Sequence, residues 1–394
     1  MKRLIFFALF LVAVAATGWA AWADKYVTAT AGGGGDGSSG TPWTLAEAIA
    51  AAAGSDRVNV KVGTYTLAAD ATFATAGTTT APIWWRGYTT TIGDLDAAGG
   101  ARVVGTNLPR IDADTATDQV VISGAYQIFS NIGVTSICTD SGGAVNVTGG
   151  NIRLIRCNID NTAANSNSRA LSTATGASVE VIGCRLKATT TATFAVSNSV
   201  ATAITGCHII GGATGLTLAS SNRVAYTVIE SFATNGMTCT SATGFIQLSN
   251  LTIYAAATNG ILVSTIPTSG AIKIENTIIG GCTNGVNNNT GGNTNGITML
   301  KVHFYNCTNN LVGITEIAAV TDDLGAALFL VDNDTDPFVN KAANDFSLVA
   351  GATTDKSTGY PGLFEGQTAM TGYPDIGAVR HVDPSGAGQT SHSY

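Results

Sequence analysis

The stretch VEVIGCRLKA (residues 179–188) decides the fold, because a phrase of the same form recurs along the chain. The related phrases are YQIFSNIGV (126–134), IRLIRCNID (152–160), TAITGCHII (202–210), VAYTVIES (224–231), FIQLSNLTIY (245–254), IKIENTIIG (272–280) and ITMLKVHFY (297–305). We call the middle residue of each phrase its key position, and these are Ile132, Cys157, Cys184, Cys207, Thr227, Leu251, Thr277 and Val302. They recur every 20 to 27 residues. Such a repeat is typical of a solenoid, because one unit cannot bury its own apolar face.

Apolar residues alternate with polar ones on both sides of the key position. Three residues before it stand Phe129, Leu154, Val181, Ile204, Val224, Leu248, Ile274 and Met299, and two residues after it stand Val134, Ile159, Leu186, Ile209, Ile229, Ile253, Ile279 and Phe304. Alternation with period two predicts strands that bury one face. The three-residue step in the middle of each phrase indicates a bend between two short strands.

A third strand is expected after each pair. Thr234-Asn235-Gly236, Thr258-Asn259-Gly260 and Thr283-Asn284-Gly285 share one form, and Thr308-Asn309-Asn310 nearly matches it. Because Asn and Gly tolerate a positive φ, we expect a tight turn there, with the next strand beginning at the apolar residue that follows. Stacked units of three strands pair in parallel about 4.8 Å apart. The sequence therefore predicts an all-β fold, a right-handed parallel β-helix with three faces and roughly 20–27 residues per coil.

The cysteines follow the same register. Cys157, Cys184 and Cys207 occupy one inward position on successive coils, and Cys282 and Cys307 a second position on two more. We expect buried packing, since a thiol behaves as a small hydrophobe. A disulfide between coils, and a metal or catalytic role, remain alternatives. The odd count of seven argues against a complete disulfide framework.

Composition limits the function classes. Only 11% of the 394 residues are charged, and the net charge is −7. No basic run or patch exists that could bind a phosphate backbone, so a nucleic-acid partner is not expected.

The first residues predict export. Lys2 and Arg3 precede an apolar run from Leu4 to Ala16, and Ala21-Trp22-Ala23 fits a cleavage site before Asp24. A secreted or cell-surface protein is therefore expected. An uncleaved anchor is the alternative, and it would be the chain's one link to a membrane.

The expected organisation follows from these signals. Residues 1–23 form the signal peptide, 24–57 an N-terminal strand and capping helix, 58–320 the β-helix, 321–385 a closing coil and C-terminal cap, and 386–394 a flexible tail. The capping helix is predicted within TLAEAIAAAAG (44–54), which Gly54 ends. A cap is needed because an open solenoid end pairs with other chains.

Several of these segments resemble a known family. The opening GGGGDGSSGTPWTLAEAIAAAAGSDRVNVKVGTYTL (32–67) is similar to that of secreted β-helix proteins of the pectate-lyase-like superfamily, and RGYTTTIGD (86–94) resembles an early loop of such proteins. DPFVNKAANDFSLVAGA (336–352) resembles their closing coil and PDIGAVR (374–380) their final strand, although AGATTDKS (350–357) departs from the usual pattern. The resemblance implies the fold over nearly the whole mature chain. It does not fix the function, because this architecture carries lyases, hydrolases, epimerases, adhesins and phage tailspikes.

Polar residues gather at the bend and just after it on the second to fifth coils. Arg185, His208 and Tyr226 are candidate catalytic residues, because such groups bind carboxylated sugars and move protons. Candidate glycan contacts are Arg156, Asn158, Lys187 and Glu230. A merely solvated polar face is the alternative, and Asp160 is expected to form an ion pair with Lys187. Asp160 and Glu230 are three coils, or about 14 Å, apart, too far for the carboxyl pair of a glycoside hydrolase.

No cofactor is expected from these residues, and calcium is the alternative. The resemblance to calcium-dependent pectate lyases would require clustered acidic ligands, which the coils do not supply. Asp332, Asp334 and Asp336 in VDNDTDPF (331–338) could bind calcium, but a structural role in the closing coil is favoured.

Two functions follow from this reading. The first is a secreted or surface β-helix that binds a polysaccharide or cell-surface glycan, or serves in the extracellular matrix or in adhesion, with self-association a further possibility. The alternative is a polysaccharide-degrading enzyme, a lyase before a glycoside hydrolase.

Overall fold

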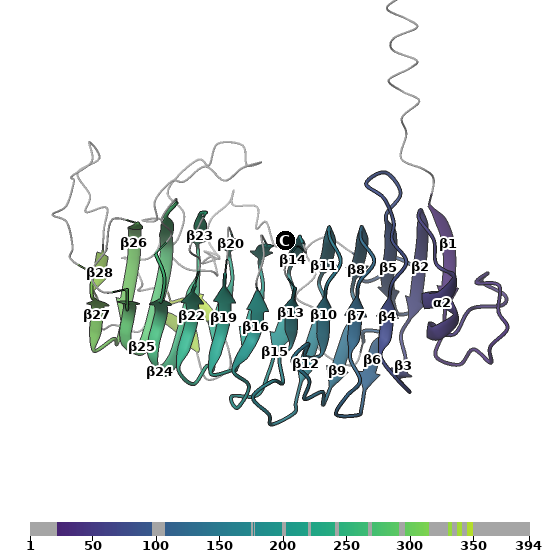
Figure 1. Ribbon diagram of the computed structural model, residues 1–394, viewed down its shortest axis with the longest axis horizontal. Coiled ribbons are helices and arrows are strands. Elements are labelled where there is room, and N and C mark those ends of the chain that lie inside the picture. The colour runs from purple at the N-terminus through teal and green to yellow at the C-terminus, as the bar shows by residue number, and fades with distance from the viewer. Residues whose placement is uncertain are drawn as a thin grey trace, which may run out of the picture.

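The computed structural model describes residues 22–96, 107–174, 176, 178–198, 202–219, 222–240, 244–266, 270–290, 296–314, 330–332, 337–340 and 345–349. These residues form a parallel β-helix in which successive coils stack along one axis (Figure 1). The expected signal peptide up to residue 21 and the tail 386–394 lie outside the described residues. Within the described part, no helix has the length and apolar character that a membrane crossing requires.

Each coil contributes one strand to each of three parallel columns. Column one contains β1 (Ala23–Val27), β2 (Asp56–Lys61), β5 (Ile83–Tyr88), β8 (Gln127–Ser130), β11 (Ile152–Ile155), β14 (Val179–Ile182), β17 (Thr202–Thr205), β20 (Asn222–Ala225) and β23 (Ile246–Ser249). Column two contains β3 (Thr64–Thr66), β6 (Arg110–Ala113), β9 (Gly133–Ser136), β12 (Asn158–Asn161), β15 (Arg185–Lys187), β18 (His208–Ile210), β21 (Val228–Glu230) and β28 (Leu330–Asp332). Column three contains β4 (Ala71–Phe73), β7 (Val120–Ile122), β10 (Val145–Val147), β13 (Leu171–Thr173), β16 (Phe194–Asn198), β19 (Thr214–Leu218), β22 (Asn235–Cys239) and β27 (Asn309–Val312).

Three longer strands run through the bends. β24 (Thr252–Val263) passes from column two to column three, β25 (Ile272–Asn288) runs through all three columns, and β26 (Ile297–Tyr305) passes from column one to column two. The pairing confirms the predicted register, because Leu154, Val181, Ile204, Val224, Leu248, Ile274 and Met299 lie directly above one another.

The key positions form one inward stack. Their side chains are all buried, with at most 5% of their surface exposed. Cys157, Cys184 and Cys207 lie on neighbouring coils, and the backbone N–H of Cys157 donates to Sγ of Cys184 at 3.3 Å. All seven cysteines are free thiols. Burial raises the pKa of Cys239 and Cys282 to about 12, so packing rather than thiolate chemistry explains these two residues.

The bend between columns one and two confirms the predicted slip in alternation. The residue just before each key position has a positive φ, between 47° and 65°. These residues are Asn131, Arg156, Gly183, Gly206, Tyr226, Asn250, Asn276 and Lys301. One left-handed residue per coil therefore turns the chain from the first face to the second.

The Thr-Asn-Gly segments differ from the prediction of a tight turn with positive φ. Asn235, Asn259 and Asn284 lie in extended strands, and their side chains form a ladder. Nδ2 of Asn259 donates to Oδ1 of Asn235 at 2.8 Å, and Nδ2 of Asn284 donates to Oδ1 of Asn259 at 3.0 Å. Asn309 extends the ladder at 3.0 Å. The glycines are needed for space, since a Cβ on Gly260 would lie 2.7 Å from the carbonyl oxygen of Gly285.

The N-terminal end carries the predicted capping helix. Helix α2 (Leu45–Ala51) begins at a capping box in which Thr44 and Glu47 satisfy each other's backbone N–H groups. Leu45 and Ala48 are buried. The helix lies against the first coil, beside β1 and β2 (Figure 1).

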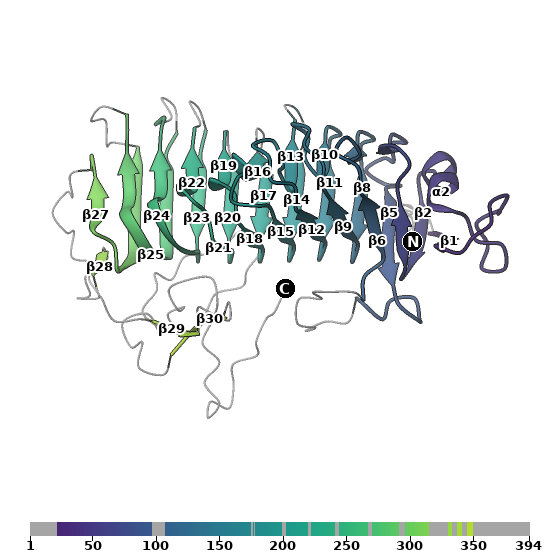
Figure 2. The ribbon, with the colours of Figure 1, turned by 90° about the horizontal axis from the view of Figure 1, so that it is seen from below.

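A C-terminal hairpin covers part of column two. Strands β29 (Phe338–Asn340) and β30 (Asp345–Leu348) pair antiparallel, and Figure 2 shows them below the solenoid. Phe338, Phe346 and Leu348 are buried in one cluster with Val228 and Ile278, which point outward from column two. This stretch of column two is therefore an internal interface.

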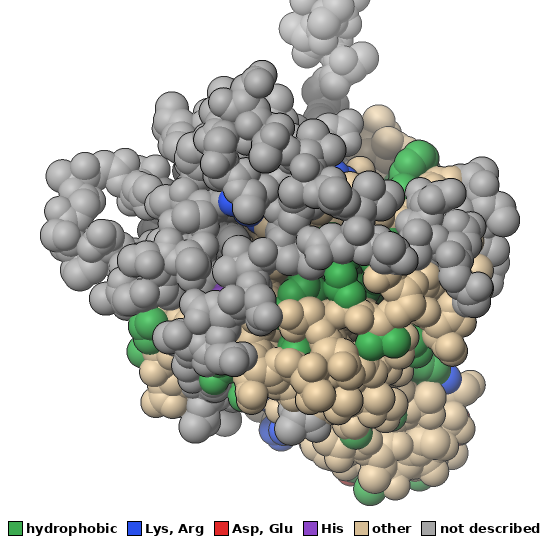
Figure 3. Space-filling model, turned by 90° about the vertical axis from the view of Figure 1, so that its left-hand side faces the viewer, with side chains coloured by type: hydrophobic (Ala, Val, Ile, Leu, Met, Phe, Trp, Pro, Cys, Tyr) green, Lys and Arg blue, Asp and Glu red, His purple; other side chains and the backbone are tan. Residues whose placement is uncertain are grey.

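The described surface is largely uncharged. Figure 3, which looks onto the end of the solenoid near β27 and β28, shows mostly uncharged and apolar side chains among the described residues.

Candidate functional site

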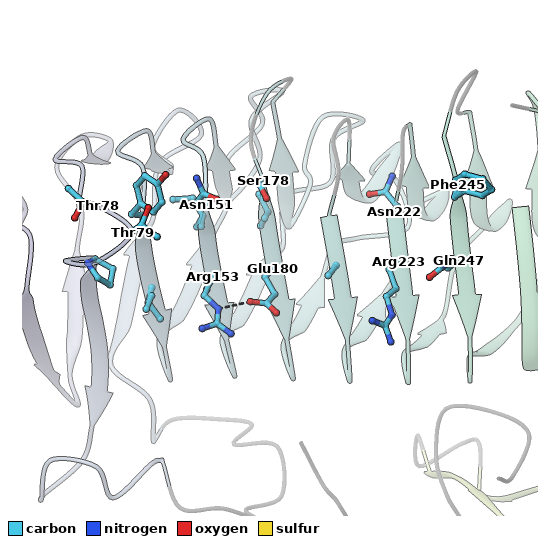
Figure 4. A pocket seen from close by; sticks show the side chains of 16 residues that line it. Thr78, Thr79, Asn151, Arg153, Ser178, Glu180, Asn222, Arg223, Phe245 and Gln247 are labelled. Carbon is cyan, nitrogen blue, oxygen red and sulfur yellow. Dashed lines mark hydrogen bonds and ion pairs between the residues drawn. The ribbon is translucent and has the colours of Figure 1, made fainter. Parts of the chain in front are cut away.

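A groove runs along the outer face of column one from β8 to β23 (Figure 4). It encloses about 710 Å³, within the range of ligand sites. Its floor is formed by Ile128, Arg153, Glu180, Ala203, Arg223 and Gln247, one residue from each of six consecutive coils. We call it the column-one groove.

The strand alternation explains why these side chains point outward. In β11, Ile152 and Leu154 are buried in the core, so Arg153 between them faces solvent. Because the coils are in register, every floor residue repeats this position about 4.8 Å further along the axis.

One edge of the groove is formed by residues at the turns that precede these strands. Tyr126, Asn151, Ser178 and Phe245 lie along it, and Thr78, Thr79 and Pro82 close the end near β8. Phe245 is 61% exposed, more than any other large apolar side chain among the described residues. An exposed ring beside amide and hydroxyl groups suits a ligand with both apolar and polar faces.

The floor contains an ion pair and a gap. Nε of Arg153 lies 2.5 Å from Oε2 of Glu180 on the next coil, and both side chains are more than 40% exposed. Ala203 follows, and its side chain ends at Cβ, so the floor is lowest there. Arg223 stands on the far side of the gap, two coils or about 10 Å from Glu180.

The predicted residues of column two are brought together in a different way. Nη1 of Arg185 donates to Oδ2 of Asp160 at 2.8 Å and to Oδ1 of Asn158 at 3.0 Å. Asp160 therefore pairs with Arg185, and the prediction of an ion pair with Lys187 is wrong. Arg185, on the next coil, lies close enough to donate to Oδ2 of Asp160 and to Oδ1 of Asn158.

His208 and Glu230 form a second contact on this face. Nε2 of His208 lies 2.6 Å from Oε1 of Glu230, and the two residues are only 9% and 4% exposed. Farther along the column, Val228 and Ile278 lie under the C-terminal hairpin. The side chains of His208 and Glu230 are mostly buried, whereas those of Arg153 and Glu180 in the column-one groove are more than 40% exposed.

The remaining predicted residues lie elsewhere. Arg156 and Tyr226 occupy the bends between columns one and two, and Nη1 of Arg156 donates to the carbonyl oxygen of Asp96 at 3.1 Å. Asp332 belongs to β28, while Asp334 and Asp336 lie outside the described residues. In the described part of the chain, no three His, Cys, Asp or Glu side chains are arranged to hold a metal ion. The catalytic, glycan-contact and calcium assignments stay predictions.

Sequence reasoning missed the column-one groove, although the repeat contained the signal. Four residues before the key position stand Ile128, Arg153, Glu180, Ala203, Arg223, Gln247 and Lys273. This position lies between two apolar positions, so it must face outward. Four of these seven residues are charged, whereas only 11% of the residues of the whole chain are charged.

Comparisons with known proteins support the fold. No family model matches the sequence, and no curated protein matches it. The structure is similar to the crystal structure of pectate lyase Pel9A, with a TM-score of 0.54 and 15% identity, covering 93% of this chain and 98% of that one. A rhamnogalacturonan lyase gives a TM-score of 0.43 and 10% identity over 80% of this chain and 90% of that one. A lacto-N-biosidase from Eubacterium ramulus gives 0.35 and 12% over 78% and 67%.

The likeness to Pel9A covers both chains almost completely. This chain thus has the right-handed parallel β-helix fold of the pectate-lyase-like proteins, as its repeats predict.

Proposed function

We propose that this protein is a polysaccharide lyase that holds a uronate-containing chain in the column-one groove and cleaves it by β-elimination. One observation carries the proposal: an open groove whose floor places a carboxylate and a guanidinium on either side of a gap. A fold neighbour of nearly equal length is a pectate lyase, which favours this chemistry as an analogy.

The groove supplies the contacts that a sugar chain needs. The exposed ring of Phe245 and the ring of Tyr126 offer apolar surface to the C–H faces of sugar rings. The amides of Asn151 and Gln247 offer donors and acceptors to the hydroxyl groups. The groove lies parallel to the solenoid axis, so an extended chain would cross one coil after another.

The reaction would take place over Ala203. Arg223 would hold the carboxylate of the uronate there, because a guanidinium binds a carboxylate through two parallel hydrogen bonds. Glu180, on the other side, would accept the proton from C5 as general base. The electron pair of the C5–H bond then forms the C4=C5 double bond, the C4–O bond breaks, and the leaving oxygen takes a proton from water. Arg153 would orient the carboxylate of Glu180 through their ion pair.

A lyase fits this groove better than a hydrolase. Glu180 is the one carboxylate among the described lining residues, whereas a glycoside hydrolase requires two, about 5–10 Å apart. Elimination requires one base and a cation for the carboxylate, and both are present.

Binding without cleavage is the second candidate function. The Arg153–Glu180 ion pair favours it, because Glu180 must turn away from Arg153 to reach a sugar proton. In this case the groove serves in adhesion or in an extracellular matrix.

The test is an assay of the chain from Asp24 onward with uronate-containing and neutral polysaccharides. Product formation is followed by the ultraviolet absorbance of the new double bond and by new reducing ends. We expect Glu180→Gln to lower kcat by about 100-fold or more, and Arg223→Gln to reduce kcat/KM strongly. Asp160→Asn is the matched control, since it breaks a comparable ion pair outside the groove.

Three outcomes decide between the functions. Absorbance that depends on Glu180 supports a lyase. Binding with no product supports the second candidate. New reducing ends without a double bond would mean hydrolysis and contradict the proposal.

A polysaccharide substrate lies outside the cell, so we propose export through residues 1–23. Expression with the native N-terminus should yield protein in the medium or periplasm whose sequence begins at Asp24. Protein that keeps residues 1–23 would indicate an anchor instead.

A further inference from the structure

An aromatic cluster lies on the outer face of column one, just beyond the N-terminal end of the groove. Trp84 in β5 is the register partner of Ile128 in β8, so it extends the groove floor by one coil. The ring of Trp22 packs on the ring of Trp84, with their centroids 5.6 Å apart and their planes inclined by 64°. Both residues are partly exposed. The cluster therefore offers aromatic surface where the groove ends.

We propose that Trp84 is a binding site for one sugar ring of the chain that lies in the groove. Trp22 occupies this site before cleavage, and removal of residues 1–23 opens it. The proposal rests on the proposed function of the groove and adds to it a subsite and the processing step that makes the subsite available.

A hydrogen bond fixes the orientation of the Trp84 ring. Its Nε1 donates to Oγ of Ser130 at 2.8 Å. Ser130 is the last residue of β8, whereas the residues that close the groove precede β5, so the ring is directed away from them. A sugar chain that lies over Ile128 can therefore continue onto Trp84, because neighbouring coils are only about 4.8 Å apart.

The charges beside the Trp84 ring are paired with each other. Cζ of Arg57 lies 6.0 Å and Cζ of Arg86 lies 5.0 Å from the ring centroid. Nε and Nη2 of Arg57 donate to the two carboxylate oxygens of Asp24 at 2.7 Å each, and Arg86 forms an ion pair with Asp96. Because each guanidinium already has a carboxylate partner, the cluster suits an uncharged apolar surface. The C–H face of a sugar ring is such a surface, and an indole ring matches it with a large apolar area.

The predicted cleavage removes Trp22 but keeps Asp24. The bond that is cut joins Ala23 to Asp24, so Trp22 leaves with the leader. Asp24 is anchored by Arg57 and by Nδ2 of Asn59, which donates to its Oδ1 at 2.8 Å, and the rest of β1 pairs with β2. Cleavage therefore removes one aromatic ring from the site without dismantling the first coil.

The experiment compares three proteins: the chain from Asp24 onward, the chain from Ala20 onward, and the longer chain with Trp22→Ala. The third protein keeps Ala23 and the hydrogen bond from its backbone N–H to the carbonyl oxygen of Ser55, at 2.9 Å, so it isolates the effect of the ring. Calorimetry measures the affinity of each protein for uronate-containing oligosaccharides of increasing length.

The difference between the proteins should depend on the length of the oligosaccharide. Trp84 lies four coils, or about 19 Å, from Ala203, where the uronate is proposed to bind. Oligosaccharides too short to span this distance should bind all three proteins equally. For longer ones we expect the chain from Asp24 and the Trp22→Ala variant to bind about three- to tenfold more tightly than the chain from Ala20, as for one aromatic contact.

Two variants of the chain from Asp24 test the ring itself. Trp84→Ala should lose the extra affinity for long oligosaccharides, while Trp84→Phe, which keeps an aromatic ring, should retain most of it. Binding of the short oligosaccharides should be unchanged in both variants, which shows that the groove is still folded. If Trp84→Ala does not fold, the comparison of the three N-terminal forms still decides the proposal.

Failure of this proposal and failure of the proposed function look different. Equal affinity of the three N-terminal forms at every length overturns the aromatic site, whether or not the groove cleaves its ligand. A length-dependent gain without an unsaturated product supports the site, while the lyase proposal fails. Absence of binding at any length overturns both. Exported protein that keeps Trp22 overturns the opening of the site by cleavage.

Discussion

At the scale of single residues, the proposed site depends on one outward position repeated from coil to coil. Strands in register bring Glu180, Ala203 and Arg223 into line although each is separated from the next by 20 or more residues. The backbone supplies the spacing, so the side chains alone decide what the floor can bind. The smallest of them, Ala203, leaves a gap between Glu180 and Arg223.

A residue-scale prediction follows for this gap. Ala203→Tyr should fill it and lower polysaccharide affinity by about tenfold or more, because a ring over the floor would exclude the sugar. The thermal unfolding temperature should hardly change, since the side chain points to solvent. Ser172→Tyr, at the outward position of β13 in column three, is the control. Loss of affinity in Ser172→Tyr but not in Ala203→Tyr would place the ligand on column three and contradict the proposed site.

The sequence could predict the direction of each side chain but not which outward column is open. Asn158, Arg185 and His208 share a column and are polar, as expected. Whether such a column is covered depends on contacts among distant residues, here the ion pairs and the C-terminal hairpin. For this reason the sequence favours column two as the site, although Arg153 and Arg223 stand at outward positions in the middle of apolar strands.

At the scale of elements, the strands and bends follow from local pattern. Alternation with period two fixed the buried face, and the single left-handed residue before each key position explains the slip in the alternation. The Asn-Gly segments could not be interpreted so simply. The same two residues suit a tight turn and an extended strand in which backbones from adjacent coils come close, and only stacking distinguishes the two cases.

An element-scale prediction tests this explanation of the glycines. Gly260→Ala would place Cβ 2.2 Å from Cγ2 of Ile279 and 2.7 Å from the carbonyl oxygen of Gly285. We expect a loss of about 1–3 kcal/mol in the free energy of unfolding, as for other overpacked sites. Gly150→Ala is the control, because no atom lies within 4 Å of its added Cβ. Equal stability of the two variants in denaturant unfolding would contradict the packing explanation.

At the scale of the whole molecule, the solenoid presents faces of different character. The C-terminal hairpin packs on column two, whereas the outer face of column one holds the groove. A fold with a long open face suits a long polymer, and the coil spacing is close to the length of a sugar ring. The solenoid could be predicted from its repeats. The docking of the hairpin could not, because DPFVN (336–340) and NDFSL (344–348) do not contain the repeated phrase.

The hairpin itself offers a prediction at this scale. Phe346→Ala should weaken its docking, because a ring that is 3% exposed would be replaced by a cavity. We expect faster proteolysis of the C-terminal segment, with the coils themselves still folded by circular dichroism. Val339→Ala, in the same hairpin but 52% exposed, should behave like the wild type. Unchanged proteolysis of Phe346→Ala would show that the hairpin is held by other contacts.

The most direct measurement is an experimental structure of the Glu180→Gln variant with a bound uronate-containing oligosaccharide. Our account predicts that the chain lies along column one between Tyr126 and Phe245, with a uronate carboxylate over Ala203 in contact with Arg223. A ligand bound along column two or column three, or a uronate carboxylate turned away from Arg223, would contradict it.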